Sequence, residues 1–131
     1  MSKIDKKFIK SSYYIADLKL CTVRLIDNSK FPWIILIPKR KSVSDITDLN
    51  SKDQSLLMKE IVYCSKIMKT VFKTSKLNIE KIGNIISQLH IHIIVRNKKD
   101  SSWPLSVWVT KGKLYKKKTL EKTLNDLIKA F

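Results

Sequence analysis

The sequence predicts a domain that combines antiparallel strands with covering helices, and three observations predict it. Residues 20–26 alternate well enough for a strand, and the turn-forming residues 27–30 lead into an apolar, β-branched return strand at 33–37. A segment that begins at Asn50 carries one apolar stripe at helical spacing, so it predicts a helix that covers the sheet. Residues 88–96 alternate between a polar and an apolar face, which is typical of a further strand.

The long helix has a start signal and one clear apolar face. Asn50 is followed three residues later by Asp53, which resembles a capping arrangement, and we expect the helix to end near Phe72. Its apolar stripe recurs at three- and four-residue spacing and consists of Leu57, Ile61, Cys64, Met68 and Val71. This stripe is expected to pack on the sheet, with lysines on the solvated side of the helix.

The remaining segments have weaker patterns. Residues 4–14 are irregular and predict a short helix or turn. Residues 77–82 predict a strand, which Gly83 and Asn84 end before the histidine strand, so the two strands are expected to be joined tightly. After a basic spacer, the chain should close with a helix whose apolar positions are Leu120, Leu124, Leu127 and Ile128.

Length and composition predict a single domain over residues 1–131. The 44% hydrophobic content is enough for a real core. No run of residues approaches the roughly 18 apolar residues of a membrane span, and no signal-peptide pattern follows the N-terminus, so a soluble cytoplasmic protein without a membrane partner is expected. Cys21 and Cys64 have no CxxC spacing and are interpreted as buried free thiols.

The formal net charge of +16 is compatible with a polyanionic partner. Of the 27 basic residues, however, 24 are lysines scattered along the chain, a pattern that an AT-rich genome also produces. Surfaces that bind nucleic acid specifically are richer in arginine with interleaved aromatic residues. We therefore expect no specific nucleic-acid binding, and a general attraction for phosphorylated ligands.

Both histidines of the chain lie in the strand at 88–96. With a period of two, Gln88, His90 and His92 project from one face, while Leu89, Ile91, Ile93 and Val95 project from the other. Two imidazoles on one strand face are compatible with metal binding, proton transfer, nucleophilic attack or a purely structural role. Metal binding is disfavoured, because no Cys or carboxylate lies nearby in the sequence to complete a first shell.

The run Gln-Leu-His-Ile-His-Ile-Ile, preceded by Gly-Asn-Ile-Ile-Ser at residues 83–87, resembles the signature of the histidine-triad (HIT) nucleotide hydrolases and transferases. Gln88 stands at the first histidine position. The resemblance covers about residues 20–108 and leaves a C-terminal helical extension at about 117–131. It is strongest to a bacterial subgroup that has Gln in the triad and a Trp-Pro…Val-Trp tail, which corresponds here to residues 103–108.

The resemblance implies an α+β fold with an antiparallel sheet of about five strands, one long helix packed on it, and a homodimer. It implies that His90 attacks the α-phosphorus of a nucleotide conjugate or dinucleoside polyphosphate, giving a nucleotidyl-histidine that water resolves. No cofactor or metal is implied. The backbone carbonyl of Gln88 would orient His90, and His92 would meet the phosphate oxygens or the leaving group.

Further contacts follow from the same resemblance. Asn84 and Ser87 match phosphate-coordinating positions, and either Asp27 or Asn28, with Asp27 slightly favoured, matches a ribose-binding residue. Without that context, all four are interpreted as turn or strand-edge residues. The tryptophans at 103 and 108 are interpreted as packing residues rather than ligand contacts.

Two departures leave two functions open. Gln88 cannot protonate a leaving group near pH 7, and the additional histidine that many members carry on the strand after the hairpin is absent. The chain is therefore either a nucleotide hydrolase or transferase that works through His90, or a noncatalytic nucleotide-binding or regulatory protein on the same fold.

Overall fold

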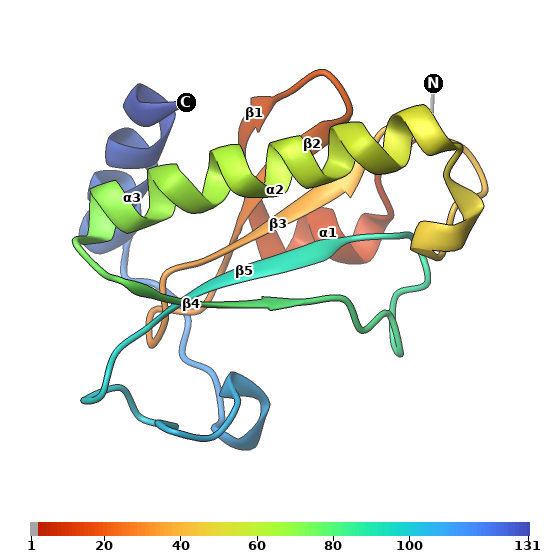
Figure 1. Ribbon diagram of the computed structural model, residues 1–131. Coiled ribbons are helices and arrows are strands. Elements are labelled where there is room, and N and C mark those ends of the chain that lie inside the picture. The colour runs from red at the N-terminus through yellow and green to blue at the C-terminus, as the bar shows by residue number, and fades with distance from the viewer. Residues whose placement is uncertain (1–2) are drawn as a thin grey trace.

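The computed structural model describes residues 3–131 as a five-stranded antiparallel sheet with three helices (Figure 1), which confirms the α+β expectation. The strands lie in the order β1-β2-β3-β5-β4, with each neighbouring pair antiparallel. The elements are α1 (Lys6–Ser11), β1 (Ser12–Asp17), β2 (Cys21–Ile26), β3 (Trp33–Pro38), α2 (Ser51–Phe72), β4 (Lys76–Glu80), β5 (Ile91–Arg96) and α3 (Lys117–Ala130). Two short 3₁₀ turns lie at Ile46–Asp48 and Val107–Val109.

The sheet has two differently covered faces. Helix α2 lies across one face (Figure 1), where its buried residues Leu57, Ile61, Cys64 and Met68 join the inward-facing strand residues in the main core. On the opposite face, Phe8 of α1 packs on Ile35 and Ile37, and Phe31, Trp33, Ile94 and Val107 form a second small cluster. Every residue of β5 is buried, because both faces of this strand are covered.

The N-terminal third of the chain contains a strand that the sequence did not predict. Residues 4–14 were expected to form a short helix or turn, and α1 fulfils this, but β1 follows directly and pairs with β2. Its register shifts between Tyr14 and Ala16, so its burial pattern does not alternate with a period of two. A bulge of this kind conceals a strand from a search for alternation.

The connection between β4 and β5 is longer than predicted. Strand β5 begins at Ile91, so residues 81–90 form an irregular segment and the expectation of a tight joint is wrong. Gly83 adopts a φ of +70°, a left-handed conformation that glycine tolerates. Leu89 donates its backbone N–H to Val43 rather than to a neighbouring strand.

Helix α2 matches its prediction, and α3 does so in part. The Asn50 side chain accepts from the backbone N–H of Asp53, as predicted. Val71 is only half-buried, because it lies at the last turn of α2. Helix α3 forms where its apolar positions predict it; Leu127 is fully buried, whereas Ile128 is 49% exposed.

Cys21 and Cys64 are buried free thiols, as predicted. Burial raises the pKa of both thiols, that of Cys64 to about 12. Within residues 3–131, no helix is both long and apolar enough to cross a bilayer.

A buried carboxylate fastens α2 to the sheet. Glu60 is 6% exposed, and its two oxygens accept from the backbone N–H groups of Leu20 and Cys21, each at 2.8 Å. These amides stand at the start of β2, where β1 does not pair with them. The carboxylate therefore satisfies two buried donors that would otherwise lack partners.

Replacement of Glu60 by alanine should destabilise the fold by about 3 kcal/mol, because two buried N–H groups lose a charged acceptor. Urea denaturation followed by circular dichroism measures the change in the free energy of unfolding. The same substitution at the exposed Glu121 of α3 is the control and should change stability little. Equal effects of the two substitutions would contradict the anchoring role of Glu60.

Candidate functional site

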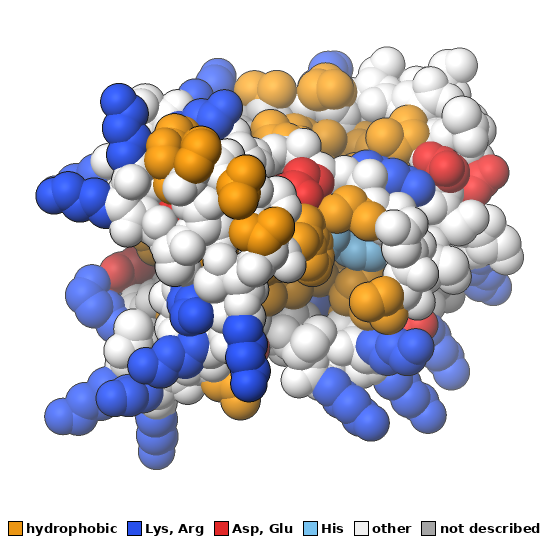
Figure 2. All heavy atoms as spheres, turned by 90° about the horizontal axis from the view of Figure 1, so that it is seen from below, with side chains coloured by type: hydrophobic (Ala, Val, Ile, Leu, Met, Phe, Trp, Pro, Cys, Tyr) orange, Lys and Arg blue, Asp and Glu red, His pale blue; other side chains and the backbone are white. Residues whose placement is uncertain are grey.

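A pocket of about 550 Å³ opens on the face of the sheet that α2 does not cover. Figure 2 shows imidazole in a hollow that is ringed by apolar side chains, with basic side chains farther out. The residues that line it come from five separate segments: Phe8, Ser11, Ile26, Trp33, Ile82, Gly83, Asn84, Ile85, Ile86, His90, His92 and Trp108. The pocket thus combines mainly apolar walls with a small group of polar atoms that includes both histidines.

His90 is held just before the first residue of β5. It is 6% exposed, and its Nδ1 lies 2.7 Å from the backbone carbonyl of Gln88, the contact that the sequence resemblance implied. A carbonyl oxygen can only accept, so Nδ1 carries the proton and Nε2 holds the lone pair. The ring of Phe8 packs edge-on against His90, with the centroids 4.6 Å apart.

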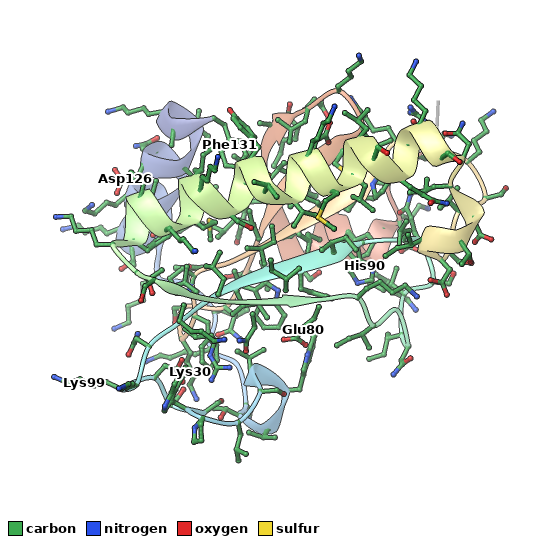
Figure 3. All side chains as sticks on the ribbon, viewed as in Figure 1. Lys30, Glu80, His90, Lys99, Asp126 and Phe131 are labelled. Atoms are coloured by element: carbon green, nitrogen blue, oxygen red, sulfur yellow. The ribbon has the colours of Figure 1, made fainter. Side chains whose placement is uncertain are left out.

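His92 has the opposite tautomer. Its Nδ1 accepts a hydrogen bond of 3.0 Å from the indole Nε1 of Trp33, and an indole N–H can only donate. The neutral ring therefore carries its proton on Nε2. The two imidazole centroids lie 4.7 Å apart, closer than the roughly 7 Å between residues two positions apart along a strand, and His90 stands just before β5. Figure 3 shows His90 and Glu80 on the side of the sheet away from α2.

Burial keeps both rings neutral at neutral pH. Desolvation, with a smaller contribution from the neighbouring His90, lowers the pKa of His92 to about 3. Desolvation also lowers the pKa of His90; the Gln88 carbonyl opposes this shift, and Lys81 adds to it. Each ring therefore keeps one proton, and the two Nε2 atoms differ: that of His90 holds a lone pair, and that of His92 carries a proton.

Trp108 completes the wall beside His92. Its ring packs edge-on against Trp33 and His92, at centroid distances of 5.0 and 5.4 Å, and its Nε1 donates to Glu80 at 2.7 Å. The sequence analysis interpreted this tryptophan as a packing residue. Its ring does pack on Trp33 and His92, but it is 51% exposed and lines the pocket, so it does not lie in the core. Trp103 instead lies beside the guanidinium of Arg96.

Arg96 positions the segment that carries Trp108. It is 1% exposed at the end of β5, and its guanidinium binds Asp100 through two hydrogen bonds of 2.8 and 3.1 Å. The same group donates to the Leu105 carbonyl and to Asn78. Its contacts to Asp100 lower the pKa of that carboxyl to about 2, so the ion pair persists across the physiological range.

The residues predicted to contact phosphate do not all line the same pocket. Asn84 lines the pocket with the histidines, next to Gly83. Ser87 and the side chain of Gln88 line a neighbouring depression instead. The Gln88 amide bonds to the backbone of residues 3 and 5, so only its main-chain carbonyl reaches His90.

The predicted ribose residues also lie outside the pocket lining. Asp27 accepts from the backbone N–H of Tyr115 at 2.9 Å and from the hydroxyl of Tyr13 at 3.1 Å. The side-chain oxygen of Asn28 accepts from the backbone N–H of Lys30 at 3.0 Å. These side chains hold the β2–β3 turn and the chain that enters α3.

Sequence reasoning missed the aromatic residues that hold the imidazoles. Phe8 lies in a segment assigned only as irregular, and Trp33 was interpreted simply as the first residue of a strand. A usable signal existed for Trp33, since a buried indole N–H needs an acceptor and the histidines are the polar side chains of a buried strand. The sequence contains no comparable signal that would put Phe8 beside His90.

Metal ligation gains no support from the geometry of the described chain. Among residues 3–131, no group of three or more His, Cys, Asp or Glu side chains is placed to hold a metal ion. Both Nδ1 atoms are already engaged in hydrogen bonds, which leaves one nitrogen on each ring.

Comparisons with known proteins identify the family. A histidine-triad protein from Bradyrhizobium japonicum is 32% identical, with a TM-score of 0.93 over 98% of this chain and 96% of that one. A HIT protein from Sinorhizobium meliloti is 28% identical, with the same TM-score and coverage. The diadenosine triphosphate hydrolase of Plasmodium falciparum shares the fold at 20% identity and a TM-score of 0.64, over 98% of this chain and 79% of that one. No curated protein sequence gives a significant match.

The family model described as HIT domain matches residues 8–99, a segment that contains all five strands, α2 and both histidines and begins within α1. Together with the likeness to the Bradyrhizobium protein over nearly the full length of both chains, this match shows that the chain belongs to the HIT domain family.

Proposed function

We propose that this protein is a nucleotide hydrolase or nucleotidyl transferase that cleaves the α-phosphate linkage of a nucleotide conjugate or dinucleoside polyphosphate. The observation that carries the proposal is the opposite protonation of two adjacent imidazoles. His90 has an unprotonated Nε2 because its Nδ1 binds the Gln88 carbonyl, and His92 has a protonated Nε2 because Trp33 donates to its Nδ1. A nucleophile and an electrophilic donor thus line one pocket.

The chemistry has two displacements. The Nε2 lone pair of His90 forms a bond to the α-phosphorus while the bond from phosphorus to the leaving group breaks, and the leaving group departs with that electron pair. Water then attacks the nucleotidyl-histidine, which releases the mononucleotide and restores the imidazole; an acceptor other than water gives transfer. The Nε2–H of His92 and the amide of Asn84 are the donors available to the phosphate oxygens.

The apolar walls support a nucleotide as the substrate class. Trp108, which is 51% exposed, gives the pocket an aromatic surface beside the histidines that suits the face of a nucleobase, and the buried Phe8 and Trp33 add apolar wall. We assign no ligand contact to Asp27, Asn28 or Ser87, because they lie outside the pocket lining. The fold shared with the Plasmodium diadenosine triphosphate hydrolase is consistent with this substrate class.

One observation favours the noncatalytic alternative. The Gln88 side chain is turned away from the pocket, and His92 is neutral, so no side chain described beside the nucleophile is a strong acid at pH 7. Substrates with poor leaving groups would then bind without turning over. Such a protein would act as a nucleotide-binding or regulatory subunit on the same fold.

The proposed working form is a cytoplasmic homodimer. The solvent side of α2 exposes Met58, Val62 and Tyr63 at 60%, 45% and 45%. Apolar side chains clustered on one helix face are typical of an association surface. The two free thiols, Cys21 and Cys64, fit a reducing compartment.

Turnover should depend on His90. Incubation with a panel of dinucleoside polyphosphates and nucleoside phosphoramidates should release mononucleotide from the native protein and none above background from His90→Ala. His92→Ala should lose on the order of 10²-fold in kcat, because it removes a donor rather than the attacking atom. Intact-mass spectrometry should detect a nucleotidyl adduct in the native protein and in His92→Ala only. Full turnover by His90→Ala on a verified substrate would rule out this mechanism.

The pH profile of kcat/KM should have a low acid limb. Only neutral His90 is a nucleophile, and burial lowers its pKa from the ordinary 6.5, so the midpoint of the acid limb should lie below pH 6.5. A phosphorylated substrate that does not titrate in this range must be used for the rate measurement. An acid limb at or above 6.5 would show that His90 is more accessible to water than its burial implies.

The solution mass should correspond to two chains. Light scattering at micromolar protein should give about twice the 15.3 kDa of one chain. Met58→Lys on the exposed face of α2 should shift the mass toward one chain, whereas Lys59→Glu beside it is a charge-changing control. A native protein that stays at 15.3 kDa across the concentration range would exclude the dimer.

A further inference from the structure

The side chain of Gln88 is engaged with the N-terminal segment. Its Oε1 accepts from the backbone N–H of Asp5 at 2.8 Å, and its Nε2 donates to the backbone carbonyl of Lys3 at 2.9 Å. One amide thus binds a donor and an acceptor of the same extended stretch. A carboxylate would retain the first bond and lose the second, because it has no donor. We call this pair of hydrogen bonds the N-terminal clasp.

The clasped segment leads directly into a wall of the pocket. Asp5 is also the N-cap of α1, where its side chain accepts from the backbone N–H of Lys7. Within the first turn of that helix, Phe8 is 2% exposed and packs edge-on against the ring of His90. The position of residues 3–5 therefore sets where Phe8 stands beside the imidazole.

The residues of the clasp line a different cavity from the one that His90 lines. Lys3, Asp5 and Gln88 line a depression of about 730 Å³, whereas Phe8 and His90 line the pocket of about 550 Å³. Helix α1 has only six residues, and helices of that length are marginal in water without outside contacts. Without the clasp, the segment that separates the two spaces would depend on the packing of Phe8 against Ile35 and Ile37.

We propose that Gln88 is a positioning residue, which fastens residues 3–5 and through Phe8 holds the ring of His90 and shields it from water. The role of His90 as a nucleophile rests on the proposed function, whereas the positioning of its ring by the clasp does not depend on that function.

The clasp can be tested without substrate. Gln88→Ala removes both hydrogen bonds. Asp5→Pro removes the N–H donor from the other side, and the φ of −54° at Asp5 suits proline. Asp5→Ala is the matched control, because it loses the same capping carboxylate but keeps the N–H. The difference between the two Asp5 variants isolates the bond to Gln88.

Two measurements report the result. Amide hydrogen exchange within α1 should rise about tenfold in Asp5→Pro relative to Asp5→Ala, as expected for one lost hydrogen bond of ordinary net strength, and by at least as much in Gln88→Ala, which loses two. The NMR titration midpoint of His90 should move up toward the ordinary imidazole value in the same variants, because water reaches the ring. The charged or titratable groups that influence this ring, His92 and Lys81, are unchanged in all of them.

Further variants sharpen the outcome. The double variant Gln88→Ala with Asp5→Pro should show no more exchange than Gln88→Ala with Asp5→Ala, because both double variants lack the capping carboxylate and both have already lost the clasp. Gln88→Glu should lie between wild type and Gln88→Ala. If exchange and the His90 midpoint stay at control values in both Gln88→Ala and Asp5→Pro, the clasp is refuted. If Gln88→Ala does not fold, the comparison of Asp5→Pro with Asp5→Ala still tests the clasp. A loss of turnover without changes in α1 exchange or in the His90 midpoint would bear on the proposed function and not on the clasp.

Discussion

The position of β5 between two buried faces is the constraint on which the rest of the structure depends. All six of its residues are buried, and its side chains alternate between the α2 core and the opposite face of the sheet, where His92 lines the pocket. A shift of one residue in its pairing with β3 would exchange the histidines for isoleucines on the pocket side. The burial of Ile91, Ile93 and Val95 against α2 therefore also fixes which face receives the imidazoles.

The same burial determines the chemical state of those imidazoles. In a desolvated setting the neutral form of each ring is favoured, and a single hydrogen bond at each Nδ1 then decides where the remaining proton lies. Gln88 contributes a carbonyl and Trp33 an indole N–H, so chemically identical side chains acquire opposite roles at Nε2. This difference arises from one acceptor and one donor, without any charged partner.

Segments distant in sequence build the remainder of the pocket. The N-terminal helix supplies Phe8, β3 supplies Trp33, and the segment after β5 supplies Trp108. Two of these are held by interactions that are remote from the pocket: the Gln88 amide fastens the segment before Phe8, and the buried Arg96 holds the segment of Trp108 through Asp100 and Leu105. The fold therefore uses buried polar contacts to place aromatic walls around a small reactive centre.

The sequence by itself determined the hairpin, the long helix with its cap, and the two faces of the histidine strand, because these depend on local periodicity and turn chemistry. The orientation of His90 by the Gln88 carbonyl followed from its resemblance to a known signature. Only the tertiary structure decided that β1 pairs with β2, since a bulge hides its alternation, and that Ser87, Asp27 and Asn28 lie outside the pocket lining. It also decided the tautomer of His92 and the direction of the Gln88 amide. Their partners, Trp33 and residues 3–5, lie more than fifty positions away, and contacts at that separation leave no periodic trace in a single sequence.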